Sequence, residues 1–146
     1  MSTTGICDTF KQQILQGTGF TGANAVTGST IKAALYLGTG ALSNATSVYT
    51  ATSEVSGAGY TAGGVSTTSG TVGLTGNVSF WQPGGAISYG TVTLSTSFDT
   101  VLLYSTGFAT ANTIAVFNFG NTTVNSGTFS INLPTNNATS ALIRLN

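Results

Sequence analysis

The sequence predicts a mainly β protein, namely an antiparallel β-sandwich of the jelly-roll or immunoglobulin-like kind with a short N-terminal α-helix. Roughly eight or nine short apolar segments are separated by Gly-, Asn- or Pro-containing turns, at the spacing of roughly 8–12 residues that such folds show. No helical pattern lies between these segments, which excludes βαβ units. The 146 residues are enough for one domain with a single core.

The one helical pattern covers residues 4–16. Ile6, Phe10 and Ile14 recur at helical spacing and form a single apolar stripe. Hydroxyl residues at the start can cap this helix, an acid lies near its positive end, and Gly17 is a natural stop.

The predicted organisation is an N-terminal helix and linker arm over residues 1–24, followed by a β-sandwich domain over residues 25–146. A helix this short needs a surface to dock against. Either it packs on its own sandwich, or it is an arm that reaches a neighbouring subunit. In the second case, Asp at Phe10 or Ile14 would weaken association and leave the sandwich folded.

The β pattern begins at residue 30. Strands are expected at residues 30–37, near 48–49, and at 65–74, 78–80, 86–94, 98–104, 113–119, 127–133 and 140–145. The first is expected to be half-buried, because it follows a period of two. Residues 113–119 are apolar on both faces and predict a central strand. In the last strand, Ala141, Ile143 and Leu145 are expected to point inward.

Residues 52–64 predict a compact corner between two β regions. The segment holds Glu54, one of three acids in the chain, and Tyr60, a large aromatic among small residues. Its four glycines give the backbone access to positive φ, which a β-branched residue at Gly59 would forbid. Valines bracket the segment and are expected to point into the core.

The residues present exclude most enzyme chemistry. The chain has no histidine, one cysteine and three acids, which removes Ser-His-Asp, Cys-His and histidine-based metal sites. Cys7 is expected to be a buried thiol. Nothing in the spacing of Glu54 and Asp99 favours a catalytic pair over separate structural roles. The sequence therefore predicts a protein that is not an enzyme and uses no cofactor or metal.

Charged residues make up 4% of the chain and the formal net charge is zero, against a charged fraction of about 25% in an average globular protein. Three basic residues are too few to hold nucleic acid or an anionic membrane. The sequence has no transmembrane pattern or signal peptide, so we expect it to be made and assembled in a cytoplasm. A charge-poor surface is easily desolvated and weakly protected against association, which favours a protein packed against neighbours. The same composition is also typical of a secreted β domain with a Ser- and Thr-rich surface.

Four stretches of the chain stand out as motifs. They are S-T-T-G-I-C-D-T-F-K-Q-Q-I-L at residues 2–15, K-A-A-L-Y at 32–36, T-S-E-V-S-G-A-G-Y-T-A-G-G at 52–64 and the apolar strand at 141–145. Together they resemble the motifs of small structural proteins of tailed bacteriophages. Residues 77–105 carry no matching motif.

The resemblance implies a non-enzymatic virion protein of the capsid decoration (cement) type, located on the capsid surface. The implied partners are the major capsid protein and copies of the chain itself as a homo-oligomer, with modest contacts adding up through avidity. The contacts are expected at the helix, the corner and the C-terminal strand, through Ile6, Phe10, Ile14, Leu15, Glu54, Tyr60 and Arg144.

A second hypothesis is a tail or adhesin component, or a free module, that binds host-surface carbohydrate. Trp81, Tyr89, Tyr60 and Tyr104 would then form a platform on which sugar rings stack. The alternative for these aromatics is a place in the core or in cross-strand pairs.

Overall fold

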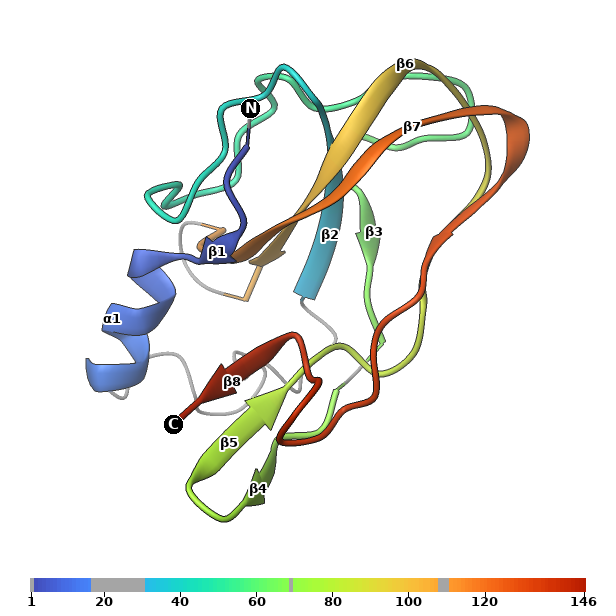
Figure 1. Ribbon diagram of the computed structural model, residues 1–146. Helices are drawn as coiled ribbons and strands as arrows, with labels where there is room; N and C mark the ends of the chain where they lie inside the picture. The colour runs from blue at the N-terminus through green and yellow to red at the C-terminus, as the bar shows by residue number, and fades with distance from the viewer. Residues whose placement is uncertain (1, 17–30, 69, 108–110) are drawn as a thin grey trace.

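The computed structural model describes residues 2–16, 31–68, 70–107 and 111–146, with the side chains of residues 14–16 outside that description. Over these residues the chain is mainly β, with antiparallel sheets and one short helix in a sandwich-like arrangement (Figure 1). This confirms the predicted fold class. The elements are β1 (Gly5–Ile6), α1 (Asp8–Gln16), β2 (Ile31–Leu37), β3 (Val65–Ser66), β4 (Gly73–Thr75), β5 (Val78–Trp81), β6 (Ile87–Ser105), β7 (Thr113–Ile131) and β8 (Ile143–Leu145).

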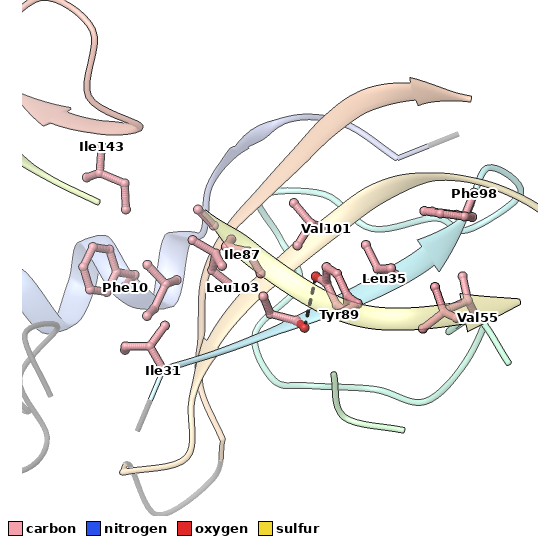
Figure 2. Close-up of a cluster of buried hydrophobic side chains, with 14 of the residues drawn as sticks. Phe10, Ile31, Leu35, Val55, Ile87, Tyr89, Phe98, Val101, Leu103 and Ile143 are labelled. Carbon is pink, nitrogen blue, oxygen red and sulfur yellow. Dashed lines mark hydrogen bonds between the residues drawn. The ribbon is translucent and has the colours of Figure 1, made fainter. Parts of the chain in front are cut away.

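Two sheets pack onto one core. The larger has the strand order β1-β7-β6-β2-β3 and the smaller has the order β4-β5-β8, with every pairing antiparallel. The smaller sheet contributes Trp81 and Ile143 to the main core cluster, which the larger sheet lines with residues such as Leu35 and Leu103. Figure 2 shows side chains of both sheets and of α1 meeting in this cluster.

Strands β6 and β7 are each 19 residues long and form the longest strand pair of the larger sheet. The sequence predicts four shorter strands here, because the polar residues 95–97 and the mainly polar residues 120–126 interrupt the apolar pattern. The predicted breaks between these strands do not occur. Both segments stay in the strands, and register shifts accommodate them. Such irregularities bend a strand pair, and Figure 1 shows β6 and β7 curving together. Both halves of β6 therefore line the main core cluster, with Ile87 and Leu94 from one half and Val101 from the other.

Strand β2 is buried on both faces and is not the half-buried strand that its period predicts. Ile31 and Leu35 enter the main core cluster, while Ala34 and Tyr36 enter a second cluster on the opposite face. The second cluster also contains Leu42, from the loop after β2, and Cys7, Leu102, Tyr104 and Val116. The second face is buried because this loop and the N-terminal segment cover it. The predicted buried thiol of Cys7 is confirmed, and burial raises its pKa.

Helix α1 begins at Asp8, four residues later than predicted. Gly5 and Ile6 are extended and pair with Val116 and Ala115 of β7, so strand pairing overrides the helical spacing of Ile6. The hydroxyl residues 2–4, which were predicted to cap the helix, therefore lie too far from its first turn to do so. The first turn is held by the Cys7 carbonyl, which accepts from the Phe10 and Lys11 N–H groups.

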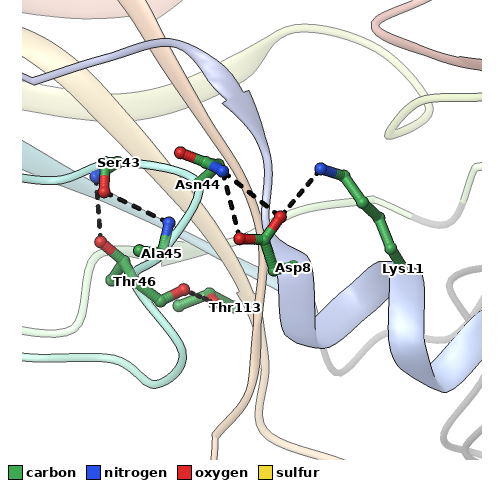
Figure 3. A network of polar contacts seen from close by, with 7 residues as sticks. All are labelled: Asp8, Lys11, Ser43, Asn44, Ala45, Thr46 and Thr113. Carbon is green, nitrogen blue, oxygen red and sulfur yellow. Dashed lines mark hydrogen bonds and ion pairs between the residues drawn. The ribbon is translucent and has the colours of Figure 1, made fainter.

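Asp8 ties the start of the helix to the loop after β2 (Figure 3). Its carboxylate pairs with Lys11 Nζ at 2.9 Å and accepts from Asn44 Nδ2 at 3.1 and 3.3 Å. Lys11 and Asn44 hold the pKa of this exposed carboxyl below its usual value. The Asp8 N–H also donates to the Asn44 carbonyl at 2.9 Å.

The helix packs on its own β domain. Phe10 is 3% exposed and belongs to the main core cluster, and β1 extends the larger sheet. The hypothesis of an arm that presents Phe10 to a neighbouring subunit is therefore wrong for this residue. The Ile14 and Leu15 side chains and the predicted boundary at residue 24 lie outside the described residues.

Replacing Phe10 with Ala should lower the free energy of unfolding by about 3–5 kcal/mol, as for other buried aromatics. Denaturant titration measures this value. Gln12→Ala, on the exposed side of the same helix, should change it by less than about 0.5 kcal/mol. Equal, small effects of both changes would mean that α1 is not docked.

Candidate functional site

The corner at residues 52–64 contacts both β2 and the N-terminal half of β6. On the β2 side, Leu37 N–H donates to the Ser53 carbonyl at 2.9 Å and Val55 N–H donates to the Leu35 carbonyl at 3.0 Å. On the β6 side, Thr93 N–H donates to the Ala58 carbonyl at 2.9 Å. The corner therefore links the central sheet to the part of β6 that curves over the core, and the side chain of Val55 is buried beneath it, as predicted.

The glycines of the corner are required by geometry. Gly59 has φ +81°, as predicted, and a Cβ there would lie 2.2 Å from the Thr91 carbonyl oxygen. Gly64 has φ +69°, and its Cβ would lie 1.8 Å from the Ala33 carbonyl oxygen. The backbone thus approaches β6 and β2 more closely than any side chain would allow. Gly57 differs from the prediction because its φ is not positive.

The Glu54 carboxylate is the centre of the corner. Oε1 accepts from Tyr60 Oη and from Gly63 N–H, both at 2.7 Å, and Oε2 accepts from Tyr49 Oη at 2.5 Å. Tyr60 Oη also accepts from the Leu35 N–H at 3.0 Å. One carboxylate therefore holds two aromatic side chains and the backbone of the corner beside β2.

The three remaining tyrosines of the chain surround this centre. Tyr104 Oη donates to the Gly63 carbonyl at 2.7 Å, and Tyr36 Oη donates to the Thr50 carbonyl at 2.5 Å. Tyr89 Oη donates to the Ala33 carbonyl at 3.3 Å, the contact drawn in Figure 2. Two ring pairs stack, Tyr49 on Tyr104 with centroids 4.8 Å apart and Tyr60 on Tyr89 at 6.1 Å. We call Glu54 and these five residues the tyrosine cluster.

The phenols of the tyrosine cluster keep their protons over the ordinary pH range. Burial, followed by the charge of Glu54, raises the pKa of Tyr104 to about 12. Burial is also the main cause that raises the pKa of the other four tyrosines, and Glu54 adds to it in each. The polar atoms of Glu54 and Tyr60 are therefore engaged inside the chain, although the sequence analysis placed both residues among the assembly contacts.

Two of the expected contact residues meet at the surface. Ile6 and Arg144 line one cavity of about 300 Å³, together with Val78, Ala138, Leu142 and Asn146. Arg144 is exposed, and its Nη1 donates to the Thr139 carbonyl at 2.7 Å. Among the described side chains, Glu54, Tyr60 and Phe10 do not join them, because Glu54 and Tyr60 lie in the corner and Phe10 is buried.

An exposed apolar surface was missed by the sequence analysis. Leu74 is 70% exposed, Val72 59% and Leu145 39%. Leu74 pairs with Ser79 and Ser79 pairs with Leu145, so both leucines lie on one face of the smaller sheet. We call Val72, Leu74 and Leu145 the apolar hairpin face. Leu145 lies on the same face as the buried Ile143, as its period predicts, but it is exposed because β8 extends beyond the core.

The sequence feature that could have predicted this exposed surface is the short length of the β4–β5 hairpin. Leu74 is followed at once by a Thr-Gly-Asn turn, and Gly76 in that turn has φ +59°. A strand of three residues that turns back so soon cannot reach far across a core, and Figure 1 shows the β4–β5 hairpin at one end of the molecule.

The predicted sugar-stacking platform does not form. Trp81, Tyr89 and Tyr104 are buried and Tyr60 is half-buried. Trp81 and Tyr89 belong to the main core cluster, and Tyr104 belongs to the second cluster. Trp81 and Tyr89 are covered within the main core and Tyr104 is covered on the opposite face of the larger sheet, so these three rings cannot stack on a sugar.

The described part of the chain contains no group of three or more His, Cys, Asp or Glu residues placed to hold a metal ion. No helix in it is long and apolar enough to cross a membrane. Comparison with protein-family models, curated proteins and solved structures finds no match.

Replacing Glu54 with Gln should lower the free energy of unfolding by about 1.5–3 kcal/mol, because an NH₂ group would replace one of the two acceptors in a charge-assisted cluster. Denaturant titration gives the value. Asp8→Asn is the matched acid-to-amide control on the surface and should leave stability nearly unchanged. If both variants behave like the natural protein, the tyrosine cluster does not hold the corner.

The tyrosine cluster also predicts alkaline unfolding. Tyr104 has a pKa of about 12 in the folded chain and about 10 when unfolded, so its protonated form stabilises the fold fully below pH 10. This contribution is lost as the pH rises from 10 to 12. Phenolate absorbance and circular dichroism should change together in that range. Ionisation of all five tyrosines near pH 10 with the fold intact would contradict the structure.

Proposed function

We propose that the chain is a non-enzymatic structural protein of a tailed-bacteriophage virion that decorates the capsid and stabilises contacts between major capsid subunits. The motifs at residues 2–15, 32–36, 52–64 and 141–145 support the phage assignment through their resemblance to small virion proteins. The observation that carries the decoration role is the apolar hairpin face, exposed on a chain of which 4% is charged.

The apolar hairpin face favours binding to another protein surface. Removing a Leu or Val side chain from water contributes about 1.5–3 kcal/mol when burial is complete. Few charges must be desolvated around it, so most of this gain is retained on association. Three such residues support a modest contact for each copy, and many copies on one shell add up through avidity.

The tyrosine cluster suits such a role because it fixes shape. A capsid joint resists internal pressure only if the decorating protein does not deform. Glu54 and its tyrosines tie the corner to β2 through contacts inside one chain, so the chain reaches its partner already ordered. Pre-ordered binding avoids the entropic cost of fixing loops at the interface.

The proposed partners are the major capsid protein and copies of the chain itself. In this proposal the chain is made in the host cytoplasm and attaches to the outer capsid surface. A tail or adhesin component that binds carbohydrate is the alternative, and burial of the predicted aromatic platform removes the sequence feature that favoured it.

Replacing Leu74 with Ser should weaken binding to capsids that lack the protein by about tenfold or more, which corresponds to about 1.4 kcal/mol. The melting temperature should stay the same because Leu74 is 70% exposed. Thr75→Ser, an exposed neighbour on the opposite face of the hairpin, is the matched control. Co-sedimentation with capsids measures the bound fraction.

Two results would contradict the proposal. If Leu74→Ser binds capsids as tightly as the natural chain, the apolar hairpin face is not the contact. If the chain is present in virions in only a few copies, at the level of a tail component, it does not decorate the shell.

A further inference from the structure

The outer edge of β7 is unpaired over most of its length. β1 pairs with this edge only at Ala115 and Val116, and the Thr4 hydroxyl accepts from the Asn118 N–H. Beyond these residues β7 has β6 on one side and, among the described residues, no strand on the other. The corner covers the other side of the β6–β7 pair, because the Ala58 carbonyl bonds to β6. The pair is therefore open on its β7 side, and Figure 1 shows this half of β7 curving out to the margin of the molecule.

The remaining edge strands are short. β1, β3, β4 and β8 are each two or three residues long, and β8 contains Arg144. Short strands and charged side chains are ways in which proteins keep a sheet edge from pairing with another chain. Residues 127–133, with the sequence G-T-F-S-I-N-L, have no charge and no proline. The bulges of β7 at residues 119–121 and 125–126 precede this segment, and Ser126 is the last residue of β7 with a positive φ.

The segment 127–133 has an apolar and a polar face. Its half-buried apolar side chains, which pack against the main core cluster, are Phe129, Ile131 and Leu133. Its exposed polar side chains are Thr128, Ser130 and Asn132. A cavity of about 230 Å³ is lined by residues 131–133 and 117–119 among others, and the described residues that line it are all uncharged. Phe119, which lines this cavity, is 37% exposed. Unpaired backbone groups thus lie beside an incompletely covered apolar surface.

This edge is complementary to itself. In an antiparallel pair of two copies centred on Ser130, Phe129 of one copy lies opposite Ile131 of the other, and the two Ser130 side chains lie opposite each other. Aromatic–β-branched pairs and hydroxyl pairs of this kind stabilise sheets, and the segment has no charge that would face its own copy. We propose that two copies of the chain pair through residues 127–133 of β7, about a twofold axis at Ser130. The contact is isologous and closes as a dimer.

The pairing satisfies backbone groups and covers apolar surface at the same time. A strand added to an edge gains affinity from main-chain hydrogen bonds and specificity from its alternate side chains. Residues that lie opposite each other in the pair project from the same face of the sheet. The second copy therefore continues the apolar face beside the cavity and Phe119. The proposal uses a different strand from the apolar hairpin face and does not depend on the proposed function.

The test is sedimentation equilibrium of the purified full chain over a range of concentrations. The natural chain should dimerise with a dissociation constant of about 1–100 μM, as a contact of modest area allows. Ser130→Lys places two like charges opposite each other at the axis and should weaken the dimer by about tenfold or more. A mixture of Ser130→Lys and Ser130→Glu should restore the dimer, because opposite charges then face each other.

Ser88→Lys is the matched control. Ser88 is exposed and pairs with Ser130 inside one chain, so it lies one strand further from the axis. The two lysines of such a dimer would be about 14 Å apart, from the spacing of strands, and salt screens charges at that distance. This variant should dimerise like the natural chain.

Hydrogen–deuterium exchange of the natural chain covers the case in which Ser130→Lys fails to fold. Amides of residues 127–133 should exchange more slowly above the dissociation constant than below it. A monomer over the whole range, a dimer unaffected by Ser130→Lys, or a dimer without protection at residues 127–133 would overturn the proposal. A monomer whose binding to capsids is lost in Ser130→Lys would also overturn it, and would assign this edge to a strand of the capsid protein.

Discussion

The Glu54 carboxylate and its three donors are the interaction on which the rest of the structure depends. Tyr49, Tyr60 and the Gly63 N–H converge on this one side chain, and Tyr60 passes the connection on to the backbone of β2. In a chain with three acids and three bases, ion pairs cannot organise the fold. A carboxylate that accepts charge-assisted hydrogen bonds from phenols takes their place, and it fixes a glycine-rich corner that would otherwise be free to move.

The corner in turn determines how the two halves of β6 lie against each other. Its Val55 N–H is hydrogen-bonded to β2, and its Ala58 carbonyl accepts from Thr93 in the N-terminal half of β6. Its glycines permit close backbone contact with both strands. The core then closes around Leu35, Leu94 and Val101. The short β4–β5–β8 sheet adds Trp81 and Ile143 to this core, while its apolar hairpin face extends past the core. A rigid body with a small apolar surface and few charges is suited to filling a joint between other proteins.

The sequence predicts the fold class, β2, β5 and the central place of β7 because local period and turn residues decide these features. It fails where distant pairing decides. Ile6 fits a helical stripe but pairs with Ala115, and the mainly polar residues 120–126 look like a loop but continue β7. The corner was recognised from its glycines. Its partners were not, since Tyr104 lies 41 residues from Gly63 and only the folded sheet brings them together. Leu74 and Leu145 look like core residues until the extent of the core is known.

The central claim is that this protein acts by shape, with the apolar hairpin face seated against a capsid subunit. A cryo-electron microscopy reconstruction of the intact virion at side-chain resolution tests it most directly. The account predicts symmetric copies on the outer shell, with Leu74 and Leu145 covered by the major capsid protein and the tyrosine cluster formed as described. Density for the chain in the tail, or on the shell with the β4–β5 hairpin facing solvent, would contradict it.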